Sequence, residues 1–239
     1  CGKVSGATSM PSDAANQWNE LYAKGPSKRY PDEAVVRIFL GNYPNLTMPK
    51  PKFGDSILDV GYGDGCNFQV FALIGMQMSG AEITPEIVRD TEYRMRNMWG
   101  INPDLRTGTC ASLPWPDATF DFLLTWNSCY YMGPDGKFED HVAEMARVIK
   151  PGGWIVCSVP KFSCFIFEDC EPATEGYVII RNDYFGLRNG ERMRWFLSAN
   201  ELETAFETHF ANFCHASIDI DMFGLAYSWH VFTAERRPA

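Results

Sequence analysis

Acidic and glycine residues cluster after the first strongly apolar segment, and their spacing suits a nucleotide-like ligand. Residues 57–60 read Ile-Leu-Asp-Val, and a turn follows with glycine at positions 61, 63 and 65. Without a Cβ atom, glycine lets the backbone bend sharply and approach a ligand closely. Glu82 lies seventeen positions beyond Gly65, where a βαβ unit places an acid at the tip of its second strand. A carboxylate there can accept hydrogen bonds from both hydroxyls of a ribose.

Alternating strand and helix patterns must position these residues. The apolar patterns predict strands near 56–60, 77–82, 103–107, 120–126 and 153–159, with helices near 66–74, 85–98 and 137–149. This alternation is typical of an α/β protein whose parallel sheet is covered on both faces. Ligands of such sheets bind beyond the carboxyl ends of the strands. We therefore expect Trp126 and Asn127 at the tip of the fourth strand to line the site, together with Ser128, Tyr130 and Tyr131 just after it.

The flanking segments complete a single domain. Two helices are expected within residues 1–50, the first capped by Ser12-Asp13. After residue 160, segments 177–180 and 192–196 are predicted to pair across Asn189-Gly190. A helix near 198–208 and two antiparallel strands, 213–222 and 225–234, then close the sheet. The predicted parts are an N-terminal helical lid (1–50), a cofactor-binding core (51–160), a substrate-side insertion (161–197), and the final helix and strands (198–239).

Four ordered motifs over about one hundred residues resemble the class I S-adenosylmethionine-dependent methyltransferases of the small-molecule type. The resemblance implies a Rossmann-like, seven-stranded, mostly parallel sheet with helices on both faces. It also implies an antiparallel last strand, and a hairpin insertion is expected before the last helix. The motifs are Ile57-Leu58-Asp59-Val60-Gly61-Tyr62-Gly63-Asp64-Gly65, the acid Glu82, Leu113-Pro114-Trp115-Pro116-Asp117-Ala118-Thr119-Phe120-Asp121, and Arg147-Val148-Ile149-Lys150-Pro151-Gly152-Gly153.

The same resemblance implies S-adenosyl-L-methionine as the cofactor. Asp59 would organise the glycine turn and the amino group of the methionine moiety, and Glu82 would bind the ribose. The family commonly has an Asp in a G-D-A-x-x-L-P sequence for adenine, but residues 108–114 here read Gly-Thr-Cys-Ala-Ser-Leu-Pro. An N-terminal segment often covers the cofactor, which makes Trp18, Tyr22 and above all Tyr30 candidate contacts. The expected cofactor-binding residues are Asp59, Gly61, Tyr62, Gly63, Glu82, Ile83, Thr109, Cys110, Ala111, Trp126 and Tyr30.

Other residues are candidates for the methyl acceptor and for catalysis. Asn127 could hold the methionine part or the substrate, and His230 on a last strand is the candidate base. Tyr130 and Tyr131 could offer ring faces to a cation. Alternation places Arg192 and Arg194 on one strand face, where they would grip a phosphate or carboxylate or else guard a solvated hairpin edge. The candidate substrate-binding residues are Tyr130, Tyr131, Arg181, Arg192 and Arg194.

These features predict an enzyme that methylates an oxygen or nitrogen of a small metabolite. A metabolite that carries a phosphate or carboxylate and belongs to glycan, lipid or natural-product biosynthesis would fit this expectation. One alternative is a nucleotide-sugar or nicotinamide-binding oxidoreductase on a related fold. That class needs a Tyr-x-x-x-Lys pair or another catalytic group against a nicotinamide, and no Tyr here has a Lys four residues later. The other alternative is a scaffold that binds cofactor without catalysis.

Composition limits the partners. The formal net charge of −9 argues against a general nucleic-acid or anionic-membrane binder. No apolar run approaches eighteen residues, and residues 1–9 do not resemble a secretory signal. The eight cysteines are scattered without a C-x-x-C pair, which predicts a reducing, cytoplasmic setting and no metal site. We expect a monomer or homodimer with a small-molecule substrate.

Overall fold

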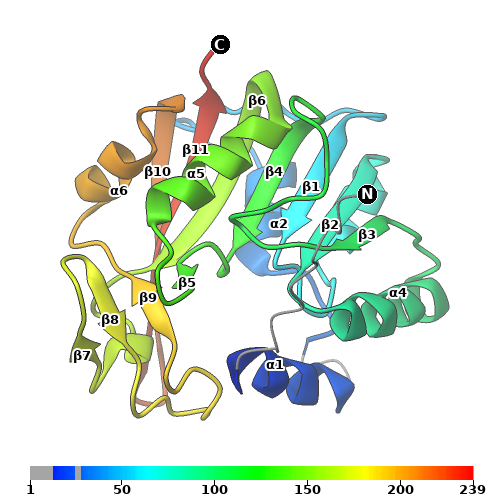
Figure 1. Cartoon of the computed structure of the whole chain (residues 1–239). Coiled ribbons are helices and arrows are strands. Elements are labelled where there is room, and N and C mark those ends of the chain that lie inside the picture. Colours follow the sequence, from blue (N-terminus) through cyan, green and yellow to red (C-terminus); the bar gives the residue numbers. More distant parts are fainter. Residues whose placement is uncertain (1–12, 25–27, 239) are drawn as a thin grey trace, which may run out of the picture.

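The computed structural model describes residues 13–24 and 28–238, and a seven-stranded sheet forms their centre (Figure 1). Its strand order is β10-β11-β6-β4-β1-β2-β3. β11 runs antiparallel to both of its neighbours, whereas the pairs from β6 to β3 are parallel. The predicted fold class is therefore confirmed. The strands are β1 (Ser56–Val60), β2 (Gln77–Glu82), β3 (Asp104–Thr107), β4 (Phe120–Trp126), β6 (Ile149–Pro160), β10 (Phe210–Met222) and β11 (Leu225–Arg236).

Helices cover both faces of this sheet, with α5 in front and α2 behind in Figure 1. Local signals set several helix starts. The hydroxyl of Thr84 accepts from the Ile87 N–H before Pro85, and the Asp32 carboxylate accepts from the Ala34 N–H. The predicted cap at Ser12 lies outside the described residues. The helices are α1 (Asp13–Ala23), α2 (Glu33–Leu40), α3 (Phe68–Ile74), α4 (Pro85–Trp99), α5 (Phe138–Val148) and α6 (Ala199–Phe206).

A second, four-stranded antiparallel sheet occupies the insertion. Its order is β5 (Tyr131–Met132), β9 (Arg192–Arg194), β8 (Tyr177–Ile179) and β7 (Glu171–Pro172), and a short 3₁₀ helix, η1 (Phe165–Phe167), precedes it. The predicted pairing is present, since Val178 lies opposite Met193. The expected tight hairpin at Asn189-Gly190 is wrong, however. Residues 180–191 form a long connection, because a separate turn over 183–186 precedes the Asn-Gly pair.

The β10–β11 hairpin extends beyond the main sheet. β11 pairs with β6 from Trp229 to Glu235, whereas residues 225–228 continue past Pro160, paired with β10. Strand alternation therefore places Trp229, Tyr227 and Leu225 on one face of the extension. Phe165 of η1 packs on that face, with 4.8 Å between its ring centroid and that of Tyr227. The hairpin thus joins the large sheet to the insertion.

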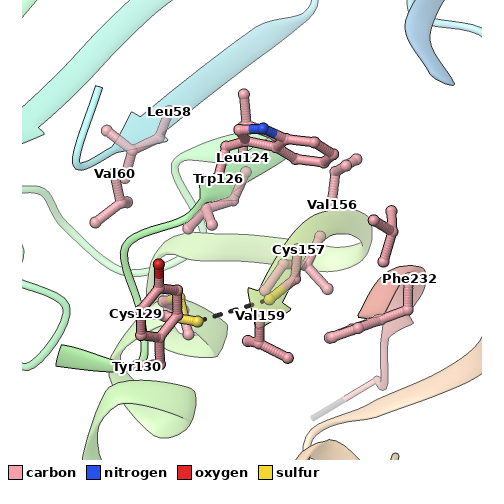
Figure 2. Packing of buried hydrophobic residues seen from close by; sticks show 14 of the residues in the cluster. Leu58, Val60, Leu124, Trp126, Cys129, Tyr130, Val156, Cys157, Val159 and Phe232 are labelled. Atoms are coloured by element: carbon pink, nitrogen blue, oxygen red, sulfur yellow. Dashed lines mark hydrogen bonds between the residues drawn. The ribbon is translucent and has the colours of Figure 1, made fainter. Parts of the chain in front are cut away.

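One continuous apolar core supports the strand tips (Figure 2). The thiols of Cys129 and Cys157 lie within it, 3.6 Å apart. All seven cysteines in the described part of the chain are free. Among the described residues, no helix is long and apolar enough to cross a membrane.

Candidate active site

A cavity of about 200 Å³ lies beyond the carboxyl ends of β1 and β4. Figure 1 shows α1 and the small sheet at the same end of the large sheet, and both contribute to the wall. The lining is rich in aromatic side chains. It consists of Trp18, Tyr22, Lys28, Asp32, Gly61, Tyr62, Gly63, Asp64, Cys66, Asn67, Trp126, Asn127, Tyr130, Tyr131, Ile166, Arg188 and Trp229.

The glycine turn packs directly against the loop that follows β4. Gly61 has φ = 72°, and a Cβ atom on it would lie 2.4 Å from the Ser128 Cβ atom. The Ser128 hydroxyl donates to the Val60 carbonyl at 2.6 Å, which ties the two segments together. Glycine is therefore required at position 61 for two reasons, the left-handed backbone and the close approach.

We expect Gly61→Ala to lower the free energy of unfolding by about 2–5 kcal/mol, the sum of the left-handed backbone cost and of overpacking. Gly100→Ala is the matched control, because Gly100 has φ = 68° but no heavy atom within 4 Å of the added methyl. It should cost only about 1–2 kcal/mol, the backbone part alone. Urea unfolding of both variants measures the difference. Equal losses would contradict the steric role of Ser128.

Buried polar atoms without partners surround the glycine turn. Asp59 is 1% exposed, and neither of its carboxylate oxygens has a hydrogen-bond partner within the described residues. Burial raises its pKa well above the ordinary value and the nearby Glu82 carboxylate adds to the effect, while the Asn67 side chain opposes it. The Tyr62 hydroxyl and the indole N–H groups of Trp126 and Trp229 are orphaned in the same way. Orphaned buried groups are rare, and this set fits a ligand that bears a cation together with hydrogen-bond acceptors. S-adenosylmethionine meets that description.

Glu82 is held within the protein. Its Oε1 accepts from the Gly63 N–H at 2.8 Å and its Oε2 from the Ile83 N–H at 3.0 Å. Burial raises the pKa of Glu82, while these two N–H groups oppose the rise. The carboxylate does not line the cavity in this structure, so it first of all anchors the glycine turn. Each carboxylate oxygen has a second lone pair, and ribose binding by Glu82 stays a prediction.

The N-terminal helix forms one wall of the cavity. Tyr22 lies against the glycine turn, since a Cβ atom on Gly63 would meet its hydroxyl at 2.5 Å. Trp18 stacks on Tyr22 at a centroid distance of 6.0 Å and meets Tyr131 edge-on at 6.1 Å. Tyr30, which the sequence favours most as a lid contact, is 77% exposed and does not line the cavity. Of the three N-terminal aromatic candidates, Trp18 and Tyr22 line the cavity.

Asn127 occupies the tip of β4 in a conformation uncommon for a residue other than glycine, with φ = 59°. Ser158 holds it there: the Asn127 N–H donates to the Ser158 hydroxyl at 2.9 Å, and that hydroxyl donates to Asn127 Oδ1 at 2.8 Å. The amide Nδ2 has no partner among the described residues. A backbone held in this way presents a hydrogen-bond donor to the cavity.

Tyr130 and Tyr131 both line the cavity, as expected from their position after β4. Their rings stack with centroids 4.8 Å apart, and Tyr130 is 1% exposed among the core side chains of Figure 2. Burial raises the pKa of Tyr131. Its phenol therefore remains protonated near neutral pH and can donate a hydrogen bond.

The arginine of the cavity is Arg188. Its Nε donates to the Tyr131 hydroxyl at 3.1 Å, and its Nη1 donates to Oδ1 of the fully buried Asp183 side chain at 2.9 Å. Its guanidinium also lies 5.9 Å from the Trp18 ring centroid. Within the described residues Nη2 has no hydrogen-bond partner. Arg188 thus keeps donors available while its own position is tightly held.

The three arginines selected from the sequence do not reach the cavity lining. Arg181 pairs with Glu171 at 2.7 Å. Arg192 lies 3.8 Å from the Tyr177 ring centroid and donates to the Gly136 carbonyl at 2.9 Å. Arg194 donates to Glu201 at 2.8 Å and lies 4.2 Å from the Phe196 ring centroid. The shared face of Arg192 and Arg194 is turned toward Tyr177, so their side chains cross-link the small sheet to its surroundings.

We therefore expect Arg194→Ala to lower the free energy of unfolding by about 1–3 kcal/mol, because it removes the hydrogen bonds of a guanidinium that is itself only 14% exposed. Arg181→Ala is the control: its pair with Glu171 is solvent-exposed and should contribute less than about 1 kcal/mol. Chemical denaturation gives both values. An Arg194→Ala protein of unchanged stability would argue that this cross-link is unimportant.

Several other candidate residues also lie outside the cavity lining. His230 is on β11, and strand alternation turns it to the face opposite Trp229. Burial lowers its pKa. Thr109 and Ser112 bridge each other by backbone hydrogen bonds, and Ile83 is 42% exposed. The candidates absent from the lining are His230, Glu82, Ile83, Thr109, Cys110, Ala111, Tyr30, Arg181, Arg192 and Arg194, with Asp59 buried behind it.

Arg188 and Trp229 both line the cavity. The sequence groups Arg188 with the other arginines of 177–196 and Trp229 with Tyr130 and Tyr131, but neither is among the candidate site residues given above. A local signal for Arg188 was present. Asp183 precedes it by five residues in a turn, where Asp183 Oδ2 also accepts from the Leu187 N–H at 2.8 Å. No group of three His, Cys, Asp or Glu side chains within residues 13–24 and 28–238 is placed to hold a metal ion.

Comparison with protein families relates the chain to methyltransferases. Residues 58–157 match the family model described as a methyltransferase domain. A demethylmenaquinone methyltransferase of Tropheryma whipplei (strain Twist) is 30% identical over 103 residues, which cover 43% of this chain and 41% of that protein. The chain thus spans about two fifths of the length of the curated relatives it matches.

Solved structures share the fold. A SAM-dependent methyltransferase of Methanosarcina mazei superimposes with a TM-score of 0.62 at 21% identity, covering 79% of this chain and 95% of that one. The Burkholderia thailandensis 1,6-didemethyltoxoflavin-N1-methyltransferase, solved with 1,6-didemethyltoxoflavin and S-adenosylhomocysteine bound, gives a TM-score of 0.61 at 16% identity. Its match covers 98% of this chain and 94% of that chain.

Proposed function

We propose that this protein, whose residues 58–157 belong to the class I S-adenosylmethionine-dependent methyltransferases, methylates an oxygen or nitrogen of a small molecule with an anionic group. The observation that carries the proposal is the shared cavity. The glycine turn at Gly61 and Gly63 forms one side of it and Arg188 another. A cofactor site and a fixed cationic group therefore open into one aromatic-lined space.

On the cofactor side, S-adenosylmethionine supplies an electrophilic methyl group on a positively charged sulfur. The methionine ammonium group requires a negatively charged partner. The buried Asp59 carboxylate would supply it, directly or through a water molecule. The orphaned Trp126 N–H and Tyr62 hydroxyl offer further polar contacts. Trp18 and Tyr22 of α1 exclude water from the same space.

On the acceptor side, the residues align the nucleophile rather than transform it. Direct displacement at a methyl group requires above all that the two partners be held in line. Asn127 and Tyr131 present hydrogen-bond donors, and Arg188 presents its free Nη2 to a phosphate or carboxylate. His230 is not needed for this arrangement, so an acceptor that ionises readily or arrives as a free amine suits the site best. No bound metal is required by this chemistry.

The substrate class agrees with the acidic composition of the chain. A net charge of −9 makes a large polyanion a poor partner, whereas a single anionic group can be gripped locally by Arg188. Cytoplasmic intermediates of glycan, lipid or natural-product biosynthesis fit this description.

Incubation of the protein with methyl-labelled cofactor and metabolite extracts, followed by mass spectrometry, tests the proposal. We expect a labelled small-molecule product that also forms in the presence of a chelator. Calorimetry with S-adenosylhomocysteine is the parallel measurement and should give micromolar affinity, about −8 kcal/mol. Cofactor binding without any labelled product would favour a non-catalytic scaffold. Absence of cofactor binding would refute the proposal.

A further inference from the structure

An aromatic strip leads out of the cavity along the extended hairpin. It consists of Trp229, Tyr227, Phe165 and Phe185, whose successive ring centroids lie 5.6, 4.8 and 5.7 Å apart. Trp229 lines the cavity and is 9% exposed, whereas Phe185 at the other end is 48% exposed. The strip therefore begins inside the site and ends at the surface. Phe165 in its middle is only 4% exposed, so Tyr227 and Phe185 supply the accessible aromatic surface outside the cavity.

Aliphatic side chains widen the outer part of this strip. Ile220 lies opposite Tyr227 in the β10–β11 ladder, and Met222 lies opposite Leu225. Ile220 and Met222 are each 51% exposed. Strand alternation puts all of them on the face that carries Trp229 and Tyr227. Exposed apolar side chains that gather in this way are typical of a binding surface.

The Arg188 side chain of the cavity and the aromatic strip lie next to each other. The Arg188 guanidinium lies 5.9 Å from the Phe165 ring centroid, and Phe165 is the middle of the aromatic strip. A molecule whose anionic group contacts Arg188 can therefore extend its apolar part over Tyr227 and Phe185. An anionic membrane surface fits less well, because the other face of the same hairpin carries Asp219 and Asp221.

We propose that the methyl acceptor is an amphiphile: its anionic, methyl-accepting head occupies the cavity and its long alkyl or prenyl chain lies along the aromatic strip. This inference rests on the function proposed above and adds the substrate class. The continuity of the strip with the cavity is its basis, since a surface for a separate protein partner would have no need to begin at Trp229.

Alkyl phosphates of four to ten carbons, each below its micelle concentration, provide the test. With S-adenosylhomocysteine present, calorimetry should show that affinity rises roughly twofold for each added methylene. A fully buried methylene raises affinity about fourfold, and a methylene that is only half buried contributes about half of that free energy. From butyl to decyl phosphate we expect at least a tenfold gain. Phe185→Ser and Ile220→Ser should each flatten the rise. Tyr93→Ser, which alters an aromatic 71% exposed on α4, is the matched control and should keep it.

The outcomes separate this inference from the proposed function. Equal affinities across the series, or a rise unchanged in both strip variants, would overturn the amphiphile inference. So would binding seen only with micelles or vesicles, because that would indicate a membrane surface instead. The proposed function fails by a different result, namely the absence of S-adenosylhomocysteine binding in the same calorimeter before any alkyl phosphate is added.

Discussion

Asp59→Asn should weaken S-adenosylhomocysteine binding by at least about tenfold while making the free protein more stable. The carboxylate is 1% exposed and only the Asn67 side chain lowers its pKa, so ionisation there carries a desolvation cost that the bound ammonium would offset. A neutral amide removes the cost together with the ligand contact. Calorimetry and thermal unfolding measure the two opposite changes.

The pH dependence follows from the raised pKa of Asp59. Between the unfolded pKa, about 3.9, and the raised folded pKa, the native state binds more protons than the unfolded state. The contribution of Asp59 to stability therefore falls as pH rises through that window, and Asp59→Asn should remove this fall. Cofactor affinity should rise over the same window as the carboxylate ionises.

Asp135→Asn is the matched control, because Asp135 is an exposed residue that is not part of the cavity lining. It should change neither cofactor affinity nor stability by more than about 0.5 kcal/mol. A stable Asp59→Asn protein with wild-type cofactor affinity would exclude Asp59 from the cofactor site.

Replacing Arg188 should raise the KM for the acceptor by about 10- to 150-fold, the value of a hydrogen bond to a charged group. The single change Arg188→Gln leaves the buried Asp183 carboxylate unpaired, which typically costs about 3–5 kcal/mol of stability. The double variant Asp183→Asn/Arg188→Gln replaces the ion pair by two neutral amides and avoids that cost. Steady-state kinetics of the double variant should therefore isolate acceptor binding.

The specificity of this effect is checked in the same assay. Affinity for S-adenosylhomocysteine should stay within about twofold, because we propose that Arg188, which lines the cavity, contacts the acceptor and not the cofactor. Arg192→Ala is the arginine control: its side chain contacts Tyr177 and the Gly136 carbonyl, not the cavity, so acceptor KM should be unchanged. If Arg192→Ala raised KM and the double variant did not, the assignment of the anion site to Arg188 would be wrong.

The sequence by itself determined the centre of the fold. Strands β1, β2 and β4 span the predicted residues. β1 and β4 are short apolar segments bounded by turn signals, and the position of β2 follows from the spacing of a βαβ unit that ends at Glu82. The glycine turn after Asp59 also follows from local chemistry, since its backbone needs positive φ at positions 61, 63 and 65. Tyr130, Tyr131 and Asn127 reach the cavity because the carboxyl ends of parallel strands meet at one edge.

Only the tertiary structure decided which arginine faces the cavity. Alternation correctly places Arg192 and Arg194 on one face of β9, and both contact the Tyr177 ring. Periodicity relates neighbouring side chains within a strand, but it does not tell which way the strand face turns. That choice depends on β5 and β7, two-residue strands whose pairing comes from long-range hydrogen bonds and leaves no local pattern.

Long-range packing also decided which aromatic side chains of the N-terminal segment line the cavity. Trp18 and Tyr22 reach the cavity, and Tyr30 does not, because α1 packs beside α4 and so places its own aromatic residues over the glycine turn. Helical spacing shows that Trp18 and Tyr22 share a face. The surface against which that face packs is set by contacts between residues about seventy positions apart, such as the Arg94 Nη1 donating to the Tyr22 carbonyl at 3.1 Å.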